Sequence, residues 1–240
     1  MKAVRFFFLI IIPVIAIAVL SDSSNHKACA DNQTAMVSDE DTISLPQPKL
    51  EGKISVEETL AKRRSVREIS DAVIEIEKLS QLLWAAQGVT HKRKGFRTAP
   101  SAGAKYPLEI YIFAGNVLGL QPGLYRYLPE GHKLVVIANY DKRRVLGRAI
   151  YKYERIIHSA AVFVIGADFE RTQIKYGTKR GPHYVYIEAG ACAQNIALQA
   201  EALYLSTVCL GAFDDVFAAQ ACQMNTEQPI LIMPIGYKQK

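Results

Sequence analysis

Three arginines and a serine lie close together in the segment Arg63, Arg64, Ser65, Val66, Arg67. A guanidinium group is planar, permanently charged and able to donate paired hydrogen bonds, so it suits the oxygens of a phosphate better than a lysine ammonium does. The segment follows a short predicted helix. Its composition indicates an anion-binding clamp, and the alternative interpretation is a solvated basic turn.

Two further segments contain small residues that leave the backbone accessible. Residues 100–107 read PSAGAKYP and lead directly into an apolar stretch, and residues 207–215 read TVCLGAFDD. On its own, the glycine of the second segment indicates only a strand-to-loop turn. Several such segments in a fixed order are much harder to meet by chance than any one short motif.

Together with the closing stretch PILIMPIGYK, these segments resemble the FMN-dependent nitroreductase family. The intervening stretch IKYGTKRGPHYVYIEAGACAQNIALQAEALYL is similar to the branch of SagB-type dehydrogenases, which oxidise thiazoline and oxazoline rings in peptides. The resemblance extends from about Ser55 to the C-terminus. It implies the nitroreductase fold, FMN as the cofactor, and a homodimer with the flavin at the subunit boundary.

The resemblance also implies roles for individual residues. Those expected to hold FMN are Arg63, Arg64, Ser65 and Arg67 at the phosphate, Pro100, Ser101 and Ala102 beside the ring, Gly211 and Ala212 near flavin N5, and Gly236 and Lys238 in a basic tail. The expected catalytic residues are Lys175 and Tyr176, because azoline oxidation sends a hydride to the flavin and a proton to a base. Without the resemblance, a surface lysine beside a packing tyrosine is the simpler interpretation.

Three other residues of the same stretch have two interpretations each. Tyr184, Tyr186 and Glu188 could line the substrate entrance or could simply pack. Ala104 stands where many relatives have an asparagine, a departure that affects one expected flavin contact.

Several functions remain open at this point. The leading one is a SagB-type dehydrogenase that transfers hydride between a small-molecule or peptide substrate and flavin N5. The alternatives are an NAD(P)H-dependent nitro- or quinone reductase and a flavin-binding protein without turnover. The N-terminus predicts export, as described below, and an exported protein is not expected to meet NAD(P)H. This expectation favours substrate oxidation over the NAD(P)H-dependent alternative.

Capping residues and hydrophobic periodicity predict the elements that position these segments. Ser55 and Glu58 form a capping box that opens a helix to about Lys62, and an amphipathic helix is predicted at 75–87. The other predicted elements are strands at 108–113, 159–166, 207–210 and 229–235, a hairpin of 123–128 and 133–138, and a long helix at 183–204. The strands and helices do not alternate in a strict βαβ order, and no GxGxxG follows the first strand, so a Rossmann domain is disfavoured. The pattern indicates an α+β fold with a mostly antiparallel sheet wrapped by helices.

The N-terminus predicts export. Lys2 and Arg5 precede an apolar run over 6–20, and residues 28–30 have the small-x-small pattern of a cleavage site. This run is shorter than the roughly 20 residues that a bilayer span needs. We therefore expect a signal peptide at 1–30 and a periplasmic or extracellular location, with an uncleaved membrane anchor as the alternative. Residues 31–50 are predicted to be a polar linker without fixed structure, and 51–240 the FMN-binding domain.

Composition limits the other ligands. The formal net charge is +6, and no basic stripe interleaved with aromatics is present, so nucleic acid is not an expected partner. The chain has 4 cysteines without a CxxC or a Cys/His cluster, so no metal site is expected. Cys192 and Cys209 are interpreted as small buried hydrophobic residues.

Overall fold

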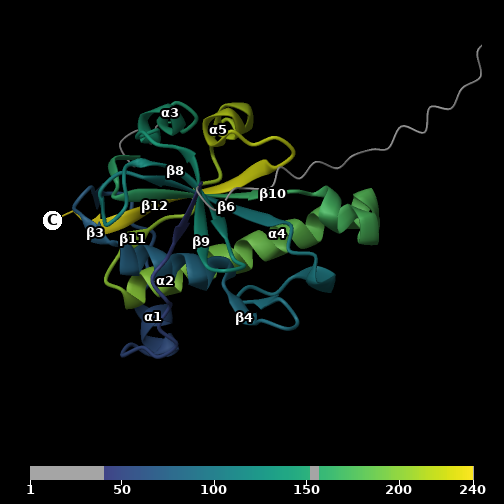
Figure 1. Ribbon diagram of the computed structural model, residues 1–240, viewed down its shortest axis with the longest axis horizontal. Helices are drawn as coiled ribbons and strands as arrows, with labels where there is room; N and C mark the ends of the chain where they lie inside the picture. Colours follow the sequence, from purple (N-terminus) through teal and green to yellow (C-terminus); the bar gives the residue numbers. More distant parts are fainter. Residues whose placement is uncertain (1–40, 152–156, 240) are drawn as a thin grey trace, which may run out of the picture. The chain divides into compact units, whose positions relative to one another are not determined.

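The computed structural model describes residues 41–151 and 157–239, and these contain one large sheet (Figure 1). The strand order is β1-β9-β8-β6-β10-β12-β11, with β2 paired to β12, and all the pairings are antiparallel. The strands are β1 (Thr42–Ser44), β2 (Ile69–Ser70), β6 (Leu108–Ala114), β8 (Gly123–Leu128), β9 (Lys133–Ala138), β10 (Ala161–Ala167), β11 (Ser206–Thr207) and β12 (Gln228–Lys238). The predicted α+β fold is confirmed.

The central strands are buried on both faces. In β6, Ile110 and Ile112 belong to one hydrophobic core, while Tyr111 and Phe113 belong to the other. Successive side chains of a strand point to opposite faces, so a continuous apolar run serves two cores at once. Helices α2 (Ile76–Gln87) and α4 (Glu170–Ala202) cover the first face, and α3 (Arg143–Gly147) and α5 (Asp215–Cys222) cover the second (Figure 1).

Shorter elements lie at the edges of the sheet. Helix α1 (Val56–Lys62) packs against α4, β3 (Ile74–Glu75) pairs in parallel with β7 (Val117–Leu118), and β4 (Val89–His91) forms a hairpin with β5 (Phe96–Arg97). A short 3₁₀ turn, η2 (Ala102–Ala104), precedes β6. The predicted hairpin of 123–128 and 133–138 and the helices at 55–62 and 75–87 are all present.

Helix α4 begins earlier than predicted. The prediction placed its start at His183, after Pro182, whereas the element runs from Glu170 and has a break at Gly177, with φ 73° and ψ 166°. Pro182 lies inside the second helical piece, five residues after this break, and does not begin the helix. The first piece, 170–176, carries Lys175 and Tyr176, so these residues lie on a helix and not in a loop.

The predicted linker is wrong in its last part. Thr42–Ser44 forms β1 and pairs with β9, and Leu45 is buried in the first core. The segment has too few apolar residues for the sequence to predict a strand. Strand β1 is recognised only from its pairing with β9. Residues 1–40, which include the predicted signal peptide, lie outside the described residues.

The predicted C-terminal strands also differ in length. The strand expected at 207–210 is only the two-residue β11, although Leu210 still bridges Ile232. The strand expected at 229–235 is longer and reaches Lys238. Among residues 41–151 and 157–239, no helix is long and apolar enough to cross a membrane.

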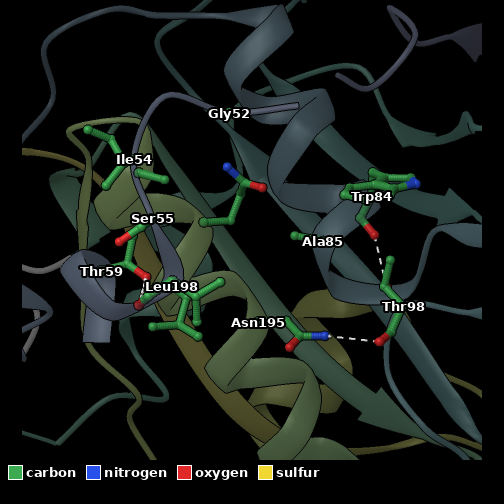
Figure 2. Close-up of a pocket in the computed structure, with 12 residues that line it drawn as sticks. Gly52, Ile54, Ser55, Thr59, Trp84, Ala85, Thr98, Asn195 and Leu198 are labelled. Atoms are coloured by element: carbon green, nitrogen blue, oxygen red, sulfur yellow. Dashed lines mark hydrogen bonds between the residues drawn. The ribbon is translucent and has the colours of Figure 1, made fainter. Parts of the chain in front are cut away.

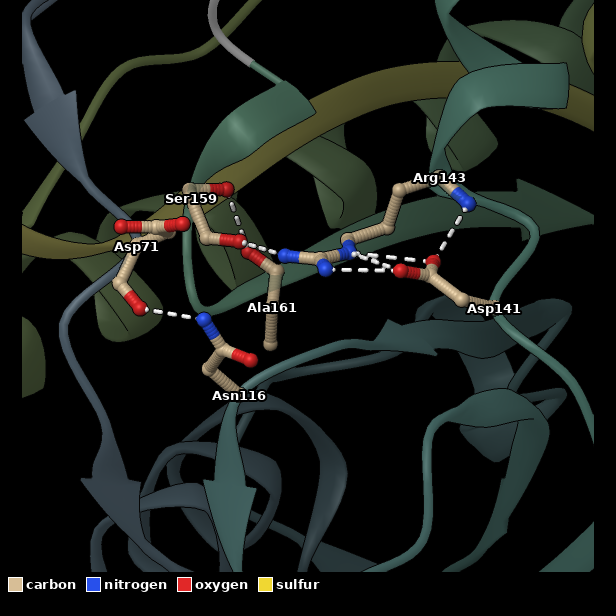
Figure 3. A network of polar contacts seen from close by, with 6 residues as sticks. All are labelled: Asp71, Asn116, Asp141, Arg143, Ser159 and Ala161. Atoms are coloured by element: carbon tan, nitrogen blue, oxygen red, sulfur yellow. Dashed lines mark hydrogen bonds and ion pairs between the residues drawn. The ribbon is translucent and has the colours of Figure 1, made fainter.

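A polar network ties the second core to one end of β6 and β10 (Figure 3). Arg143 is held by a double contact with Asp141 and donates from Nη1 to the carbonyl of Ser159 at 2.6 Å. Its guanidinium lies against Gly115, at a distance where a Cβ on that glycine would overlap it. Asn116 donates to the carbonyl of Asp71 at 2.6 Å, so the turn after β6 is fixed from both sides.

Candidate functional site

Helix α1 delivers the basic segment to the edge of the sheet. Ser55 caps the helix by accepting from Glu58 N at 3.1 Å, and the helix ends at Arg63, whose N–H donates to Thr59 O. Beyond it the chain is extended, and Ser65 bridges Thr207 in parallel. The segment 63–67 therefore runs beside β11, which precedes Gly211.

The three arginines of this segment have different surroundings. The guanidinium of Arg64 donates from Nη1 to the carbonyls of Ala61 and Arg63 at 3.0 and 2.8 Å, which closes the end of α1. Arg67 is exposed and Arg63 is half-buried. Arg63 lies near Cys209, where partial desolvation of the sulfur raises the pKa of the thiol and the arginine charge opposes that rise. Cys209 is exposed, contrary to the prediction, whereas Cys192 is buried as expected.

Strand β12 brings the C-terminal basic residue to the same edge. Lys238 pairs with Ile69 of β2, and Gln239 N donates to Glu68 O at 2.9 Å. The two strands approach closely at Gly236, where a Cβ would lie 2.5 Å from Ser70 O. The predicted clamp and the predicted basic tail are therefore neighbours in space.

Gly211 and Ala212 follow the bridge between Leu210 and Ile232. Both residues are exposed, and a Cβ placed on Gly211 would meet no atom within 4 Å. Next in the chain, Asp214 caps α5 by accepting from Phe217 N at 2.9 Å. The backbone at 211–212 is thus held at both ends and uncovered in between.

The expected catalytic residues meet the bend at 100–104. Gly103 has φ 61°, and a Cβ on it would lie 2.6 Å from Lys175 Nζ and 2.8 Å from Tyr176 Oη. Ser101 Oγ accepts from Tyr106 N at 2.8 Å, which stabilises the bend from inside. The ring of Tyr176 also packs against Tyr184, with 4.7 Å between centroids. Two segments assigned separately from the sequence therefore form one site.

A buried carboxyl lies near Ser101 of the same bend. Glu188 of α4 is only 2 % exposed, and its Oε1 has no hydrogen-bond partner among the described residues. Burial raises its pKa to about 7, against the opposing effects of Ser101, Arg97 and Gln87. From the sequence, Glu188 could either line the substrate entrance or pack. The available signal was a glutamate on the buried face of an alanine-rich helix.

Comparison with known proteins settles the family. The sequence model described as "Nitroreductase family" matches residues 60–237. The chain belongs to the nitroreductase family. Its members are oxidoreductases, and the recognition made from the ordered segments is confirmed at this level.

Individual relatives agree with the nitroreductase assignment. "Putative nitroreductase MJ1384" of Methanocaldococcus jannaschii is 43% identical over 198 residues, which cover 82% of this chain and 98% of the relative. The microcin B17-processing protein McbC of Escherichia coli is 29% identical over 150 residues, 58% of this chain and 54% of McbC. The trifolitoxin-processing protein TfxB of Rhizobium leguminosarum is 27% identical over 119 residues, 48% of this chain and 31% of TfxB.

Solved structures share the nitroreductase fold. A protein from Ralstonia eutropha with the same description as MJ1384 superposes with a TM-score of 0.72 at 30% identity, covering 83% of this chain and 90% of its own. A chain of the E. coli microcin synthetase complex McbBCD superposes with a TM-score of 0.65 at 24% identity, covering 82% and 79%. The second likeness shows the fold alone.

The residues of this nitroreductase-family protein fit a flavin mononucleotide. Its phosphate needs cationic and hydroxyl donors, which Arg63, Arg67, Ser65 and Lys238 supply at one edge of the sheet. Thr207 Oγ1, beside this edge, is buried and has no partner among the described residues. The flat ring needs space next to accessible backbone, and the open surface over Gly211 offers it.

A separate cavity of about 270 Å³ lies between α1, α2 and α4 (Figure 2). Around it, Thr98 donates to Trp84 O at 3.0 Å and accepts at its own carbonyl from Asn195 Nδ2 at 3.4 Å. Its lining carries no ionisable side chain, and it includes none of the residues expected to hold FMN. General acid–base chemistry therefore does not belong there.

Proposed function

We propose that this nitroreductase-family protein is an FMN-dependent dehydrogenase of the SagB type. It oxidises an organic substrate of the peptide azoline class by transferring a hydride to the flavin. The observation that carries the proposal is the meeting of Lys175 and Tyr176 with the bend at Gly103. The bend leads into Leu108, level with the Gln228 end of β12, whereas Lys238 is at the other end of that strand. One flavin therefore contacts both regions only across the proposed subunit boundary. The similarity to McbC and TfxB, whose names describe processing of microcin B17 and trifolitoxin, supports it.

The residues divide the work between binding and proton transfer. Arg63, Ser65, Arg67 and Lys238 hold the phosphate, and Gly211 and Ala212 present backbone donors to the ring. When bound, FMN supplies an acceptor for hydride. Lys175 or Tyr176 removes the proton that leaves the substrate, from a position held by the packing of Tyr176 on Tyr184.

The cofactor proposal is tested by binding. Arg63→Ala and Arg67→Ala should each weaken FMN binding roughly tenfold or more, because a charge-assisted hydrogen bond contributes about 1.5 to 3 kcal/mol. Arg64→Ala should lose less FMN affinity, since the guanidinium of Arg64 already donates to the carbonyls of Ala61 and Arg63. Fluorescence titration of the purified protein measures these affinities, with the exposed Arg93→Ala as the control. Unchanged affinity in both Arg63 and Arg67 variants contradicts the clamp.

The reaction proposal is tested by turnover. Lys175→Ala and Tyr176→Phe should slow oxidation of a thiazoline-containing peptide at least tenfold while FMN stays bound, because proton abstraction contributes on the order of 100-fold or more to such steps. Lys179→Ala, an exposed lysine of the same helix beyond Gly177, is the matched control. Equal losses in the Lys175 and Lys179 variants contradict the assignment.

The second candidate is an NAD(P)H-dependent nitro- or quinone reductase, which the identity with MJ1384 favours. Stopped-flow mixing separates the two functions. Rapid bleaching of the flavin by NADPH supports the reductase, and bleaching by the azoline peptide alone supports the dehydrogenase. A flavin that no donor bleaches supports binding without turnover.

We also propose that the protein is a homodimer with the flavin at the subunit boundary. Large apolar side chains are exposed on two helices that flank the first core, namely Val56 and Leu60 of α1 and Ile187 of α4. Sedimentation equilibrium of the FMN-loaded protein tests the proposal, and a monomer at micromolar concentration contradicts it.

A further inference from the structure

The site contains a buried polar group that the proposed hydride transfer does not use. Glu188 Oε1 and Gln87 Nε2 are both buried and without a hydrogen-bond partner among the described residues. One is an acceptor and the other a donor, and Gln87 and Ser101 lie close enough to Glu188 to lower its pKa without reaching good hydrogen-bond geometry. A buried carboxyl that is satisfied so poorly calls for an explanation, because buried polar groups normally have well-formed partners.

The residues around Glu188 offer it no ion pair. Arg97 of β5 is the nearest cation, but it donates from Nη1 to Gln87 Oε1 at 3.3 Å and stacks on the ring of Tyr106, with 4.5 Å from Cζ to the centroid. On α4 itself, one turn later, burial raises the pKa of Cys192, so its thiol stays neutral. Lys175 Nζ and Tyr176 Oη lie close to Gly103 of the same bend, and neither forms an ion pair with Glu188. A carboxyl in this setting is stable when protonated and can be charged only at a cost.

We infer that Glu188 binds a proton at its unpartnered Oε1 when hydride transfer adds negative charge beside the Ser101 bend, and releases it when that charge leaves. This inference depends on the proposed function, because it requires a flavin next to the bend. Glu188 acts through the bend, so it is a positioning residue. Its proton uptake keeps the net charge of the site constant.

The step balances in atoms and electrons. Oxidation of an azoline to an azole breaks two C–H bonds and forms one C=C bond. One hydrogen leaves with both electrons as hydride, and the other leaves as a proton to Lys175 or Tyr176. Glu188 takes up one proton in this exchange, and an O–H bond forms from a carboxylate lone pair at Oε1.

The affinity of Glu188 for protons suits this role. Its pKa of about 7, which burial raises, leaves the group mostly protonated at pH 6 and mostly ionised at pH 8. Proton uptake on reduction should therefore occur above about pH 7. Added negative charge nearby raises the pKa further, which extends the window to higher pH.

The test is the pH dependence of the flavin midpoint potential, measured spectroelectrochemically on the FMN-loaded protein. One additional proton for two electrons steepens the potential by about 30 mV per pH unit, a tenfold change in the equilibrium constant per unit. We expect the wild type to show this additional slope above about pH 7 and Glu188→Gln to lack it. Glu201→Gln, a carboxylate near the far end of α4, should behave as the wild type.

A second measurement keeps the inference testable if Glu188→Gln is poorly folded. Glu188→Asp keeps the carboxyl and should restore the additional slope. Reduced-minus-oxidised infrared spectra should show a protonated carboxyl band in the wild type. The same slope in wild type and Glu188→Gln, with no such band, overturns the inference and leaves the dehydrogenase intact. A protein that binds no FMN overturns the proposed function itself, and with it this inference.

Discussion

Three ionisable residues near the site differ in their burial and in their hydrogen-bond and ionic partners. Arg64 is committed to the end of α1, because both of its acceptors are backbone carbonyls. Arg67 is exposed and available to an anion. Glu188 is enclosed and has no cation within ion-pair distance among the described residues. Residue type alone does not distinguish these cases, because burial and partners set the free energy of each charge.

Glu188 makes folding stability depend on pH in the absence of cofactor. Its folded-state pKa of about 7 lies above the ordinary value of 4.5, so the native state binds more protons between these values. Its contribution is fully present below pH 4.5 and is lost as the pH rises through 7, a change of roughly 3 kcal/mol. Glu188→Gln should remove this part of the pH dependence. Urea unfolding of the cofactor-free protein at several pH values measures it, and an unchanged curve contradicts the assignment.

At the scale of elements, the break in α4 and the bend before β6 act together. Gly177 ends the first helical piece at Tyr176, and Gly103 provides the space that Lys175 and Tyr176 occupy. Both glycines have positive φ, which other residues adopt only at a cost. Helix, break and bend therefore determine where Lys175 and Tyr176 lie.

Gly103→Ala should reduce turnover at least tenfold while FMN remains bound. The added methyl overlaps Lys175 Nζ and Tyr176 Oη and displaces both side chains. The matched control is Gly95→Ala, since Gly95 has φ 65° and no atom within 4 Å of its Cβ position. Both variants should lose about 1 kcal/mol of stability from the backbone alone. Equal turnover in the two variants contradicts the role of the bend.

The pairing of β12 with β2 positions Lys238 beside the clamp. Gly236→Ala should force these strands apart, because its Cβ would lie 2.5 Å from Ser70 O, a backbone atom. FMN affinity should fall about tenfold or more, as for the loss of a charged contact. Isothermal titration calorimetry measures it, and Gly52→Ala, with no atom near its Cβ, is the control. Wild-type affinity in Gly236→Ala contradicts this arrangement.

At the scale of the molecule, the folded unit begins before the predicted boundary at 51. Leu45 N donates to His132 O, and Lys49 exchanges two backbone hydrogen bonds with the side chain of Gln81 at 2.8 and 3.0 Å. Ser80 donates to Pro46 O and also contacts His132 Nε2. The segment 42–49 therefore ties the β8–β9 hairpin to α2. The predicted signal peptide, its anchor alternative and export stay predictions, since they concern residues 1–30.

Two truncated chains test this boundary. A chain that begins at Glu51 should lose at least about 2 kcal/mol of stability relative to one that begins at Asp41, because it lacks the buried Leu45 and the pairing of β1. Chemical denaturation of both chains measures the difference. Equal unfolding midpoints contradict the assignment of 42–49 to the folded unit.

The sequence by itself determined the features that depend on residues close together in the chain. The capping of α1, the amphipathic α2, the hairpin of β8 and β9 and the ordered family segments all follow from short-range patterns. Only the tertiary structure decided that β1 belongs to the sheet, that Lys175 and Tyr176 lie on the bend at Gly103, and that Glu188 has no ionic partner. These features arise from contacts between segments far apart in the chain, and no local propensity encodes the burial or the charge that such contacts create.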